Sequence, residues 1–268
     1  MSSGLFLAQA IQQGQRGTLR LRIHAMLFHM VGTIIVATLA FALIRLIWYP
    51  GFFWTIAAGS ELFVLICAID IVLGPLLTFA VFNPAKGIRR LQSDLLFIVI
   101  VQLAALSYGL WTLATVRPLF LVYTVDRFNL VTASEITKDQ LRSAELPQYR
   151  ELRWLDPQII GSREPISGDE KFEFIDSALS GRDRHLFPKT YVPFEQVAGQ
   201  MLDHARPLDN LKSVTTKQTE VVAAVQNRFA VDHPKLGFVP VVAQGDWVMV
   251  VDRATGELLD ALPIDGLK

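Results

Sequence analysis

The sequence predicts a membrane protein with three transmembrane α-helices, followed by a C-terminal α+β domain outside the membrane with an antiparallel sheet. Three observations lead to this fold class. Only 19% of the residues are charged and the mean hydropathy is +0.37, whereas about 25% charged residues is usual for soluble domains. Residues 1–116 contain three long runs with almost no charged side chain. Residues 117–268 instead alternate β-rich runs with helical stripes, as a folded soluble domain does.

The charges are unevenly distributed although the formal net charge is zero. Residues 1–116 carry seven Lys or Arg and three Asp or Glu, whereas residues 117–268 carry 18 and 22. This composition excludes a purely soluble enzyme and a disordered chain, and it lacks the concentrated basic face of a nucleic-acid-binding protein. The single cysteine, Cys67, excludes an intramolecular disulfide and a Cys-based zinc site.

Each of the three apolar runs is 22 to 24 residues long. At 1.5 Å per residue such a run forms about 33–36 Å of helix, enough to cross a hydrocarbon core of about 30 Å. The charged residues that border the runs are Arg22 and Arg45, Glu61 and Lys86, and Asp94 and Arg117. We therefore expect transmembrane helices at residues 27–48, 61–82 and 95–116. They form a transmembrane domain over residues 27–116, after an N-terminal tail at residues 1–26.

The flanking cations predict the orientation of these helices. The N-terminal tail carries three arginines, and the loop at residues 83–94 carries Lys86, Arg89 and Arg90, whereas the loop at residues 48–60 carries no Lys or Arg. Because cytoplasmic loops are enriched in Lys and Arg, we expect the N-terminus and the 83–94 loop in the cytoplasm. The C-terminal domain is then outside. Aromatic residues expected at the outer membrane surface agree with this orientation: Trp48, Tyr49, Phe52, Phe53, Trp54 and Trp111.

Residues 117–268 begin and end with strand-like runs. Residues 119–125 and 128–132 are rich in β-branched and aromatic side chains, with Asp126 and Arg127 at the break between them. Similar runs near the C-terminus lie at residues 238–243, 247–251 and 257–262. We therefore expect an antiparallel sheet assembled from both ends of the domain. Pro240 has no backbone N–H, so its strand is expected at an edge or a bulge.

Three helical stripes lie between these strand-like runs, and the helices are expected to pack on one face of the sheet. Ser167 opens a capping-box pattern before the first stripe. The three stripes consist of Phe172, Ile175 and Leu179, of Phe194, Val197, Ala198, Met201 and Leu202, and of Val221, Val222, Val225 and Phe229. Several prolines and glycines mark residues 146–168 as an irregular connector.

Asp70 is the most unusual residue in the chain. It lies nine residues after Glu61, about 13 Å along a helix, and therefore near the middle of the bilayer. A carboxylate at that depth costs a few kcal/mol unless it is neutral or paired. Candidate partners within this chain are Arg45, Gln102, Ser107 and Tyr108. Two interpretations stay open: Asp70 faces a cavity or a partner helix, or it forms an internal polar clamp between the three helices.

Two further pairs of residues are candidates for partner binding. Gly74 and Pro75 predict a kink and a small packing notch near Asp70, although a bend that merely fits the helices together is the simpler explanation. Asp126 and Arg127 lie near the outer membrane surface, where turn chemistry between two strands is the simpler explanation.

No catalytic, cofactor-binding or metal-binding residues are predicted. The sequence contains no pair of histidines at i, i+4 spacing, no H-E-x-x-H motif and no glycine-rich phosphate loop. Asp183 and His185 are close in sequence, but no G-x-S-x-G motif accompanies them.

Several short motifs follow one another within residues 20–132. They are Trp48-Tyr-Pro-Gly51, Asp70-Ile-Val-Leu-Gly-Pro-Leu-Leu-Thr78, Val81-Phe-Asn-Pro84, Gln102-Leu-Ala-Ala-Leu-Ser-Tyr-Gly-Leu-Trp111, Arg117-Pro118 and Tyr123-Thr-Val-Asp-Arg-Phe128. In combination they resemble the type IV pilin accessory proteins of the TfpX/TfpZ type. The remainder of the C-terminal domain carries no motif that extends the resemblance.

This resemblance implies a multi-pass inner-membrane protein of Gram-negative bacteria with a periplasmic C-terminal domain. It implies a non-enzymatic, chaperone-like role in type IV pilus assembly, without a cofactor. The expected partners are the cognate pilin subunit and membrane lipids, and neither nucleic acid nor a small-molecule substrate is expected. On this interpretation Asp70, Gly74 and Pro75 form the binding surface in the membrane, and Asp126 and Arg127 contribute outside it.

Two other function classes remain as alternatives. One is a sensor that acts through a partner protein, because the short cytoplasmic parts leave no room for an output domain. The other is a membrane hydrolase that uses Asp70 or the region of Asp183 and His185.

Overall fold

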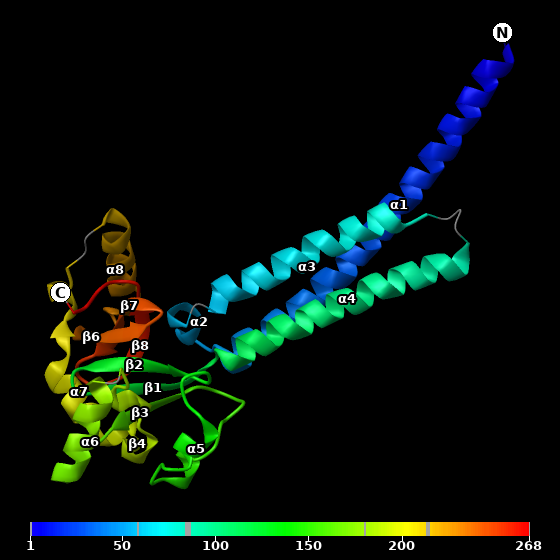
Figure 1. The fold of residues 1–268 in the computed structure, drawn as a ribbon. Helices are drawn as coiled ribbons and strands as arrows, with labels where there is room; N and C mark the ends of the chain where they lie inside the picture. Colours follow the sequence, from blue (N-terminus) through cyan, green and yellow to red (C-terminus); the bar gives the residue numbers. More distant parts are fainter. Residues whose placement is uncertain (1, 58, 84–86, 180, 213–214, 268) are drawn as a thin grey trace. The chain divides into compact units, whose positions relative to one another are not determined.

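A computed structural model describes residues 2–57, 59–83, 87–179, 181–212 and 215–267 (Figure 1). Of the residues used in the sequence predictions, Pro84 and Lys86 lie outside the described residues. The chain divides into two compact units. The first, which we call the helical unit, comprises Met1–Leu43 and Glu61–Leu113. The second, which we call the sheet unit, comprises Ile44–Ser60 and Ala114–Lys268.

The helical unit is built from three helices, α1 (Ser2–Leu43), α3 (Gly59–Val81) and α4 (Ile88–Thr115). Among the described residues, two segments are long and apolar enough to cross a membrane, Thr18–Trp48 and Ile88–Thr115. The apolar segment within α3 is shorter and comprises Ile66–Val81. Two candidate membrane helices are thus established by length and composition, and the third span stays a prediction.

The connection between α1 and α3 packs with the sheet unit. It contains a π-helical turn (Ile44–Trp48) and the short helix α2 (Phe53–Ile56). Tyr49 is fully buried and Phe53 is 5% exposed, and the backbone N–H of Asp156 donates to the Ile47 carbonyl at 3.2 Å. The sequence interpretation placed Tyr49 and Phe53 in an aromatic belt at the lipid surface, which is wrong for these two rings because protein atoms cover them.

The sheet unit contains eight strands and four further helices within its described residues. The strands are β1 (Pro118–Thr124), β2 (Arg127–Thr132), β3 (Gln158–Ser162), β4 (Tyr191–Pro193), β5 (Arg206–Pro207), β6 (Leu236–Ala243), β7 (Gly245–Asp252) and β8 (Leu258–Leu262). The helices are α5 (Lys138–Leu141), α6 (Gly168–Leu179), α7 (Ala198–His204) and α8 (Thr216–Phe229). Short 3₁₀ turns lie at Pro147–Tyr149, Arg184–Leu186, Pro188–Thr190, Phe194–Gln196 and Leu208–Asn210.

The sheet is mixed, and the predicted purely antiparallel sheet is wrong. The strand order is β4-β3-β1-β2-β6-β7-β8, with β5 paired to β6. The two ends of the domain do meet, as predicted, because β2 pairs with β6. That pairing is parallel, however, as is the pairing of β1 with β3. The β1–β2 hairpin lies in the middle of the sheet, and long connections that contain helices bring β3 and β6 back in parallel on its two sides.

The strand β3 was missed in the sequence, where residues 146–168 were expected to be irregular. Its five residues pair with β1 on one side and with β4 on the other. The run is short and ends in Gly161 and Ser162, so its composition resembles a loop. Tertiary pairing, rather than local propensity, determines this strand.

Pro240 lies in an interior strand, contrary to the prediction of an edge or a bulge. It is paired in register with Val248 of β7. On the other side of β6, β5 pairs with Gly237 and Phe238, and β2 pairs with Val241 and Val242. Pro240 falls between these two short pairings, so a missing N–H is tolerated there.

Two of the three predicted helical stripes pack into the sheet unit. Met201 of α7 is fully buried and Val225 of α8 is 6% exposed, and both belong to predicted stripes. The stripe of α6 is different, because Phe172, Ile175 and Leu179 are 61–85% exposed. The capping is partly as predicted: the Ser167 hydroxyl accepts from the Glu170 N–H at 3.1 Å. The amphipathic pattern thus predicts the helix correctly but not a buried position for its apolar face.

Candidate functional site

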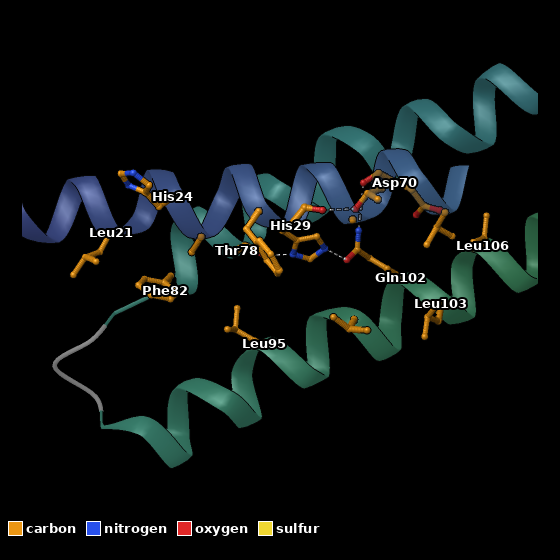
Figure 2. A pocket seen from close by; sticks show the side chains of 16 residues that line it. Leu21, His24, His29, Asp70, Thr78, Phe82, Leu95, Gln102, Leu103 and Leu106 are labelled. Atoms are coloured by element: carbon orange, nitrogen blue, oxygen red, sulfur yellow. Dashed lines mark hydrogen bonds between the residues drawn. The ribbon is translucent and has the colours of Figure 1, made fainter. Parts of the chain in front are cut away.

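The helical unit contains a pocket of about 710 Å³ between α1, α3 and α4 (Figure 2). We call it the groove. Its lining residues recur at helical spacing along α1 and α4, and they are mostly apolar. They are Leu21, His24, Ala25, Phe28, His29, Gly32, Thr33 and Val36 from α1, Asp70 and Thr78 from α3, Phe82 directly after α3, and Leu95, Val99, Gln102, Leu103 and Leu106 from α4.

A chain of hydrogen bonds joins the three helices at the groove. The Nε2 atom of His29 lies 2.6 Å from the Oε1 atom of Gln102, and its Nδ1 atom lies 2.6 Å from the Oγ1 atom of Thr78. Because the Gln102 carbonyl oxygen only accepts, a neutral His29 donates through Nε2 and accepts the Thr78 hydroxyl proton at Nδ1. Gln102 in turn donates through Nε2 to the main-chain oxygen of Asp70 at 3.3 Å. Thr78 is 1% exposed, so these bonds satisfy polar groups inside the bundle.

The carboxylate of Asp70 is left outside this chain of hydrogen bonds. Asp70 is 9% exposed and lines the groove. Within the described residues no side chain or backbone group donates a hydrogen bond to its carboxylate oxygens; the Gln102 amide reaches only its main-chain oxygen. Figure 2 shows Asp70 beside Leu106 at one end of the row of lining side chains, with Leu21 and His24 at the other end.

Among the described residues, Gln102 is the one predicted partner that forms a hydrogen bond with Asp70. The side-chain amide of Gln102 binds the main-chain oxygen of Asp70 and not its carboxylate. The Nη1 atom of Arg45 donates to the Tyr49 carbonyl at 3.3 Å. Tyr108 is 69% exposed, with its ring 5.9 Å from that of Trp111, and Ser107 is exposed as well. The internal clamp is thus formed by His29, Thr78 and Gln102 rather than by the Asp70 carboxylate.

Gly74 and Pro75 shape the groove from within α3. Both are buried, and Pro75 lies inside the helix. A Cβ atom added to Gly74 would overlap the amide of Gln102, with the Gln102 Cδ atom only 2.6 Å away. Gly74 therefore allows α4 to approach α3 closely enough for the Gln102 hydrogen bonds. Its predicted part in partner binding stays a prediction.

His29 is the site residue that the sequence analysis missed. It lies between Thr78 and Gln102 in the groove. The distance of a polar residue from the charged border of its apolar run could have identified His29. His29 lies seven residues inside Arg22, and Gln102 lies eight residues inside Asp94, so both are about 11–12 Å into their apolar runs.

Asp126 and Arg127 bind each other in the sheet unit. Asp126 lies in the turn after β1 and Arg127 begins β2. The Nε and Nη2 atoms of Arg127 donate to the two carboxylate oxygens of Asp126 at 2.8 and 3.2 Å. The hydrogen bonds from Arg127 lower the pKa of Asp126. Both residues line a pocket of about 460 Å³ with His204 and Arg206, and their predicted part in partner binding stays a prediction.

His185 lies in a second pocket of the sheet unit, of about 280 Å³, together with Ser134 and Glu135. Its neighbours hold other partners: Ser134 Oγ lies 2.9 Å from Thr132 Oγ1, and Glu135 accepts from the Thr132 N–H and hydroxyl at 2.7 Å. This geometry gives no particular support to hydrolase chemistry at His185. Among the described residues no group of three His, Cys, Asp or Glu is placed to hold a metal ion.

The stability of the sheet unit is expected to fall as the pH drops below about 6.5. Burial lowers the pKa of His185 below its ordinary value of 6.5, against the smaller opposing effects of Asp183 and Glu135. The unfolded chain then binds more protons than the folded chain, so the free energy of unfolding decreases towards the folded pKa by up to about 1.4 kcal/mol per pH unit. Thermal unfolding of the full chain in detergent at pH 7 and pH 5.5 measures this, and His185→Asn should flatten the dependence. An equally steep dependence in His185→Asn would contradict it, with His24→Asn as the control.

Comparison with known proteins places the chain in a family. It is 34% identical over 116 residues to the fimbrial assembly protein of serogroups C1 and C2 from Dichelobacter nodosus, an alignment that covers 88% of that relative and 43% of this chain. The chain belongs to the family of fimbrial assembly proteins. The resemblance to pilus accessory proteins drawn from the membrane-half motifs is thereby confirmed.

The similarity to fimbrial assembly proteins extends over both units. The fimbrial assembly protein of serogroup I from Dichelobacter nodosus is 28% identical over 228 residues, which cover 84% of this chain and 88% of the relative. The protein of serogroup E1 is 27% identical over the same length. An alignment of 228 residues is longer than either unit alone. No family model and no solved structure matches the chain.

Proposed function

We propose that this protein is a non-enzymatic accessory factor of type IV pilus assembly that binds the cognate pilin subunit before polymerisation. Its relatives are named fimbrial assembly proteins, which supports a role in building pili. The observation that carries the binding role is the groove with its buried, unpaired Asp70 carboxylate. Polar groups buried in a membrane bundle are costly and usually functional.

In the proposed topology α1, α3 and α4 all cross the inner membrane. The 23 residues of α3 make about 35 Å of helix, which is sufficient for a span. The N-terminus is cytoplasmic and the sheet unit is periplasmic, as the distribution of Lys and Arg suggests. In this arrangement the groove meets a subunit within the bilayer, and the pocket at Asp126 and Arg127 meets the part of the subunit outside it.

Substitution of Asp70 tests the proposal in piliated cells. We expect Asp70→Leu to reduce both surface pili and co-purification of the pilin subunit by at least about ten-fold, which corresponds to about 1.4 kcal/mol of lost binding free energy. Glu61→Leu, which removes an exposed carboxylate from the same helix, should leave both unchanged. Electron microscopy counts the pili, and immunoblotting measures the bound subunit.

Other outcomes would point to the alternative function classes. Normal piliation and normal pilin binding in Asp70→Leu cells would contradict the proposal. A sensor would instead alter pilin transcription without affecting subunit binding. An Asp70-dependent hydrolase would keep binding the subunit while its turnover was lost.

A further inference from the structure

The groove has three properties that together define what fits it. It is elongated, it is mostly apolar, and towards one end it holds a carboxylate to which no group in the described part of the chain donates a hydrogen bond. Its α1 side runs from Leu21 to Val36, which is about 22 Å at helical rise and matches some four turns of a second helix. We infer that the groove receives an apolar helix of the pilin subunit, which presents a cationic or hydrogen-bond-donating group to Asp70. This inference rests on the proposed function for the identity of the partner.

Asp70 supplies the chemical requirement on the occupant. Its side chain is nine-tenths buried and lines the groove. Lipid acyl chains carry no donor, so lipid filling the groove would leave the carboxylate unsatisfied. A helix that carries an ammonium, a guanidinium, a hydroxyl or an amide at the matching depth would satisfy it, and charge complementarity favours a cation.

Gly32 supplies an independent geometric observation. A Cβ atom added to Gly32 would meet no heavy atom within 4 Å, so the packing of α1 against α3 and α4 does not require a glycine there. The same position lines the groove. Glycine is disfavoured in a helix interior, but at a surface that contacts another membrane helix it allows the two backbones to approach closely. Gly74 differs, because a Cβ atom there would overlap Gln102 of the same bundle. Gly74 therefore serves packing between α3 and α4, whereas Gly32 shapes the groove.

The hydrogen bonds of His29 hold the polar side chains that line the groove in place. His29 and Gln102 line the groove, and their hydrogen bonds with Thr78 hold the three helices to one another. Their polar groups are thus occupied within the chain, whereas that of Asp70 is not. The occupant is therefore expected to make one polar contact, at Asp70, and apolar contacts elsewhere.

Photocrosslinking from adjacent positions of α4 tests this inference in the full chain, in piliated cells. Val99 lines the groove, whereas its neighbour Ile100 is 56% exposed and lies outside the lining. A photoreactive amino acid at position 99 should form an adduct with the pilin subunit, and one at position 100 should not. The adduct should map to the apolar helix of the subunit.

Two substitutions then separate the groove from the rest of the protein. Gly32→Leu fills the groove and should lower the adduct from position 99 at least ten-fold, as should Asp70→Leu. Ala104→Leu places the same side chain at an exposed position outside the groove and should leave the adduct unchanged. Thermal unfolding confirms that Gly32→Leu remains folded.

The outcomes also distinguish this inference from the proposed function. Adducts only with lipid, or with a second copy of this chain, would overturn the inference. So would normal piliation in Gly32→Leu cells when Asp70→Leu cells lack pili, although the proposed function would then stand. Absence of any pilin adduct from position 99 and from position 126, with normal pili in Asp70→Leu cells, would overturn both.

Discussion

Replacing Gly161 with valine is expected to destabilise the sheet unit by about 3 kcal/mol. Gly161 lies in β3, opposite Tyr123 of β1 and Val192 of β4. A Cβ atom at this position would overlap the Val197 side chain, whose Cγ1 atom would be 2.7 Å away. Valine side chains have few alternative rotamers, so the segment before α7 must move away from the sheet. Urea unfolding of the full chain in detergent, followed by tryptophan fluorescence, measures the loss.

Gly199 provides the matched control for this substitution. It lies in α7, only two residues beyond Val197, and a Cβ atom there would meet nothing within 4 Å. Gly199→Ala should therefore stabilise the unit by about 0.5–1 kcal/mol, because alanine favours a helix interior. If Gly161→Val proved as stable as the native chain, the close packing of β3 against Val197 would be wrong.

Replacing Gly74 with leucine is expected to displace the Gln102 side chain from the α3–α4 contact and to cost about 2 kcal/mol. The added side chain would occupy the position of the Gln102 amide. Gln102 would then lose its hydrogen bonds to His29 and to the main-chain oxygen of Asp70, which would leave polar groups unsatisfied inside the bundle. Helical circular dichroism of the full chain during heating in detergent measures the stability.

The thiol of Cys67 gives a second, local measurement of the same event. Cys67 is 7% exposed in α3, and its reaction with a membrane-permeant maleimide should accelerate in Gly74→Leu. Gly32→Leu adds the same side chain at a glycine of α1 where a Cβ atom would meet nothing within 4 Å, so it should neither lower the stability nor accelerate the thiol reaction. Equal destabilisation by both substitutions would show that bulk in any helix, rather than the α3–α4 contact, is responsible.

Much of the helical unit follows from the sequence, because a run without charges has few structural alternatives in a membrane. The predicted spans overlap α1, α3 and α4 and agree with them to within five residues at Leu43, Gly59 and Thr115, whereas α1 begins much earlier, at Ser2, and α4 begins at Ile88. Asp70 was identified from the free-energy cost of a carboxylate in the middle of the bilayer, and in the structure it lines the groove. The position of His29 was harder to predict, since a histidine seven residues inside a charged border also fits the membrane surface.

The sheet unit was less predictable, for physical reasons that differ between elements. The strand β3 has a loop-like composition and is held by partners that lie 29 to 38 residues away in sequence. Pro240 is tolerated because two different strands share the opposite side of β6. The stripe on α6 has the period of a packed helix, but periodicity identifies only an apolar face and not what covers it.

The burial of Tyr49 and Phe53 has a consequence for deletion analysis. A truncation that ends after α4 would remove residues 116–268, which belong to the same unit as the connection between α1 and α3. The two aromatic rings would lose that unit's cover, and the Ile47 carbonyl would lose its contact with Asp156. A phenotype of such a truncation therefore cannot be attributed to the missing domain alone, because the helical fragment would itself be altered. Point substitutions dissect this protein more cleanly than shortened versions of it.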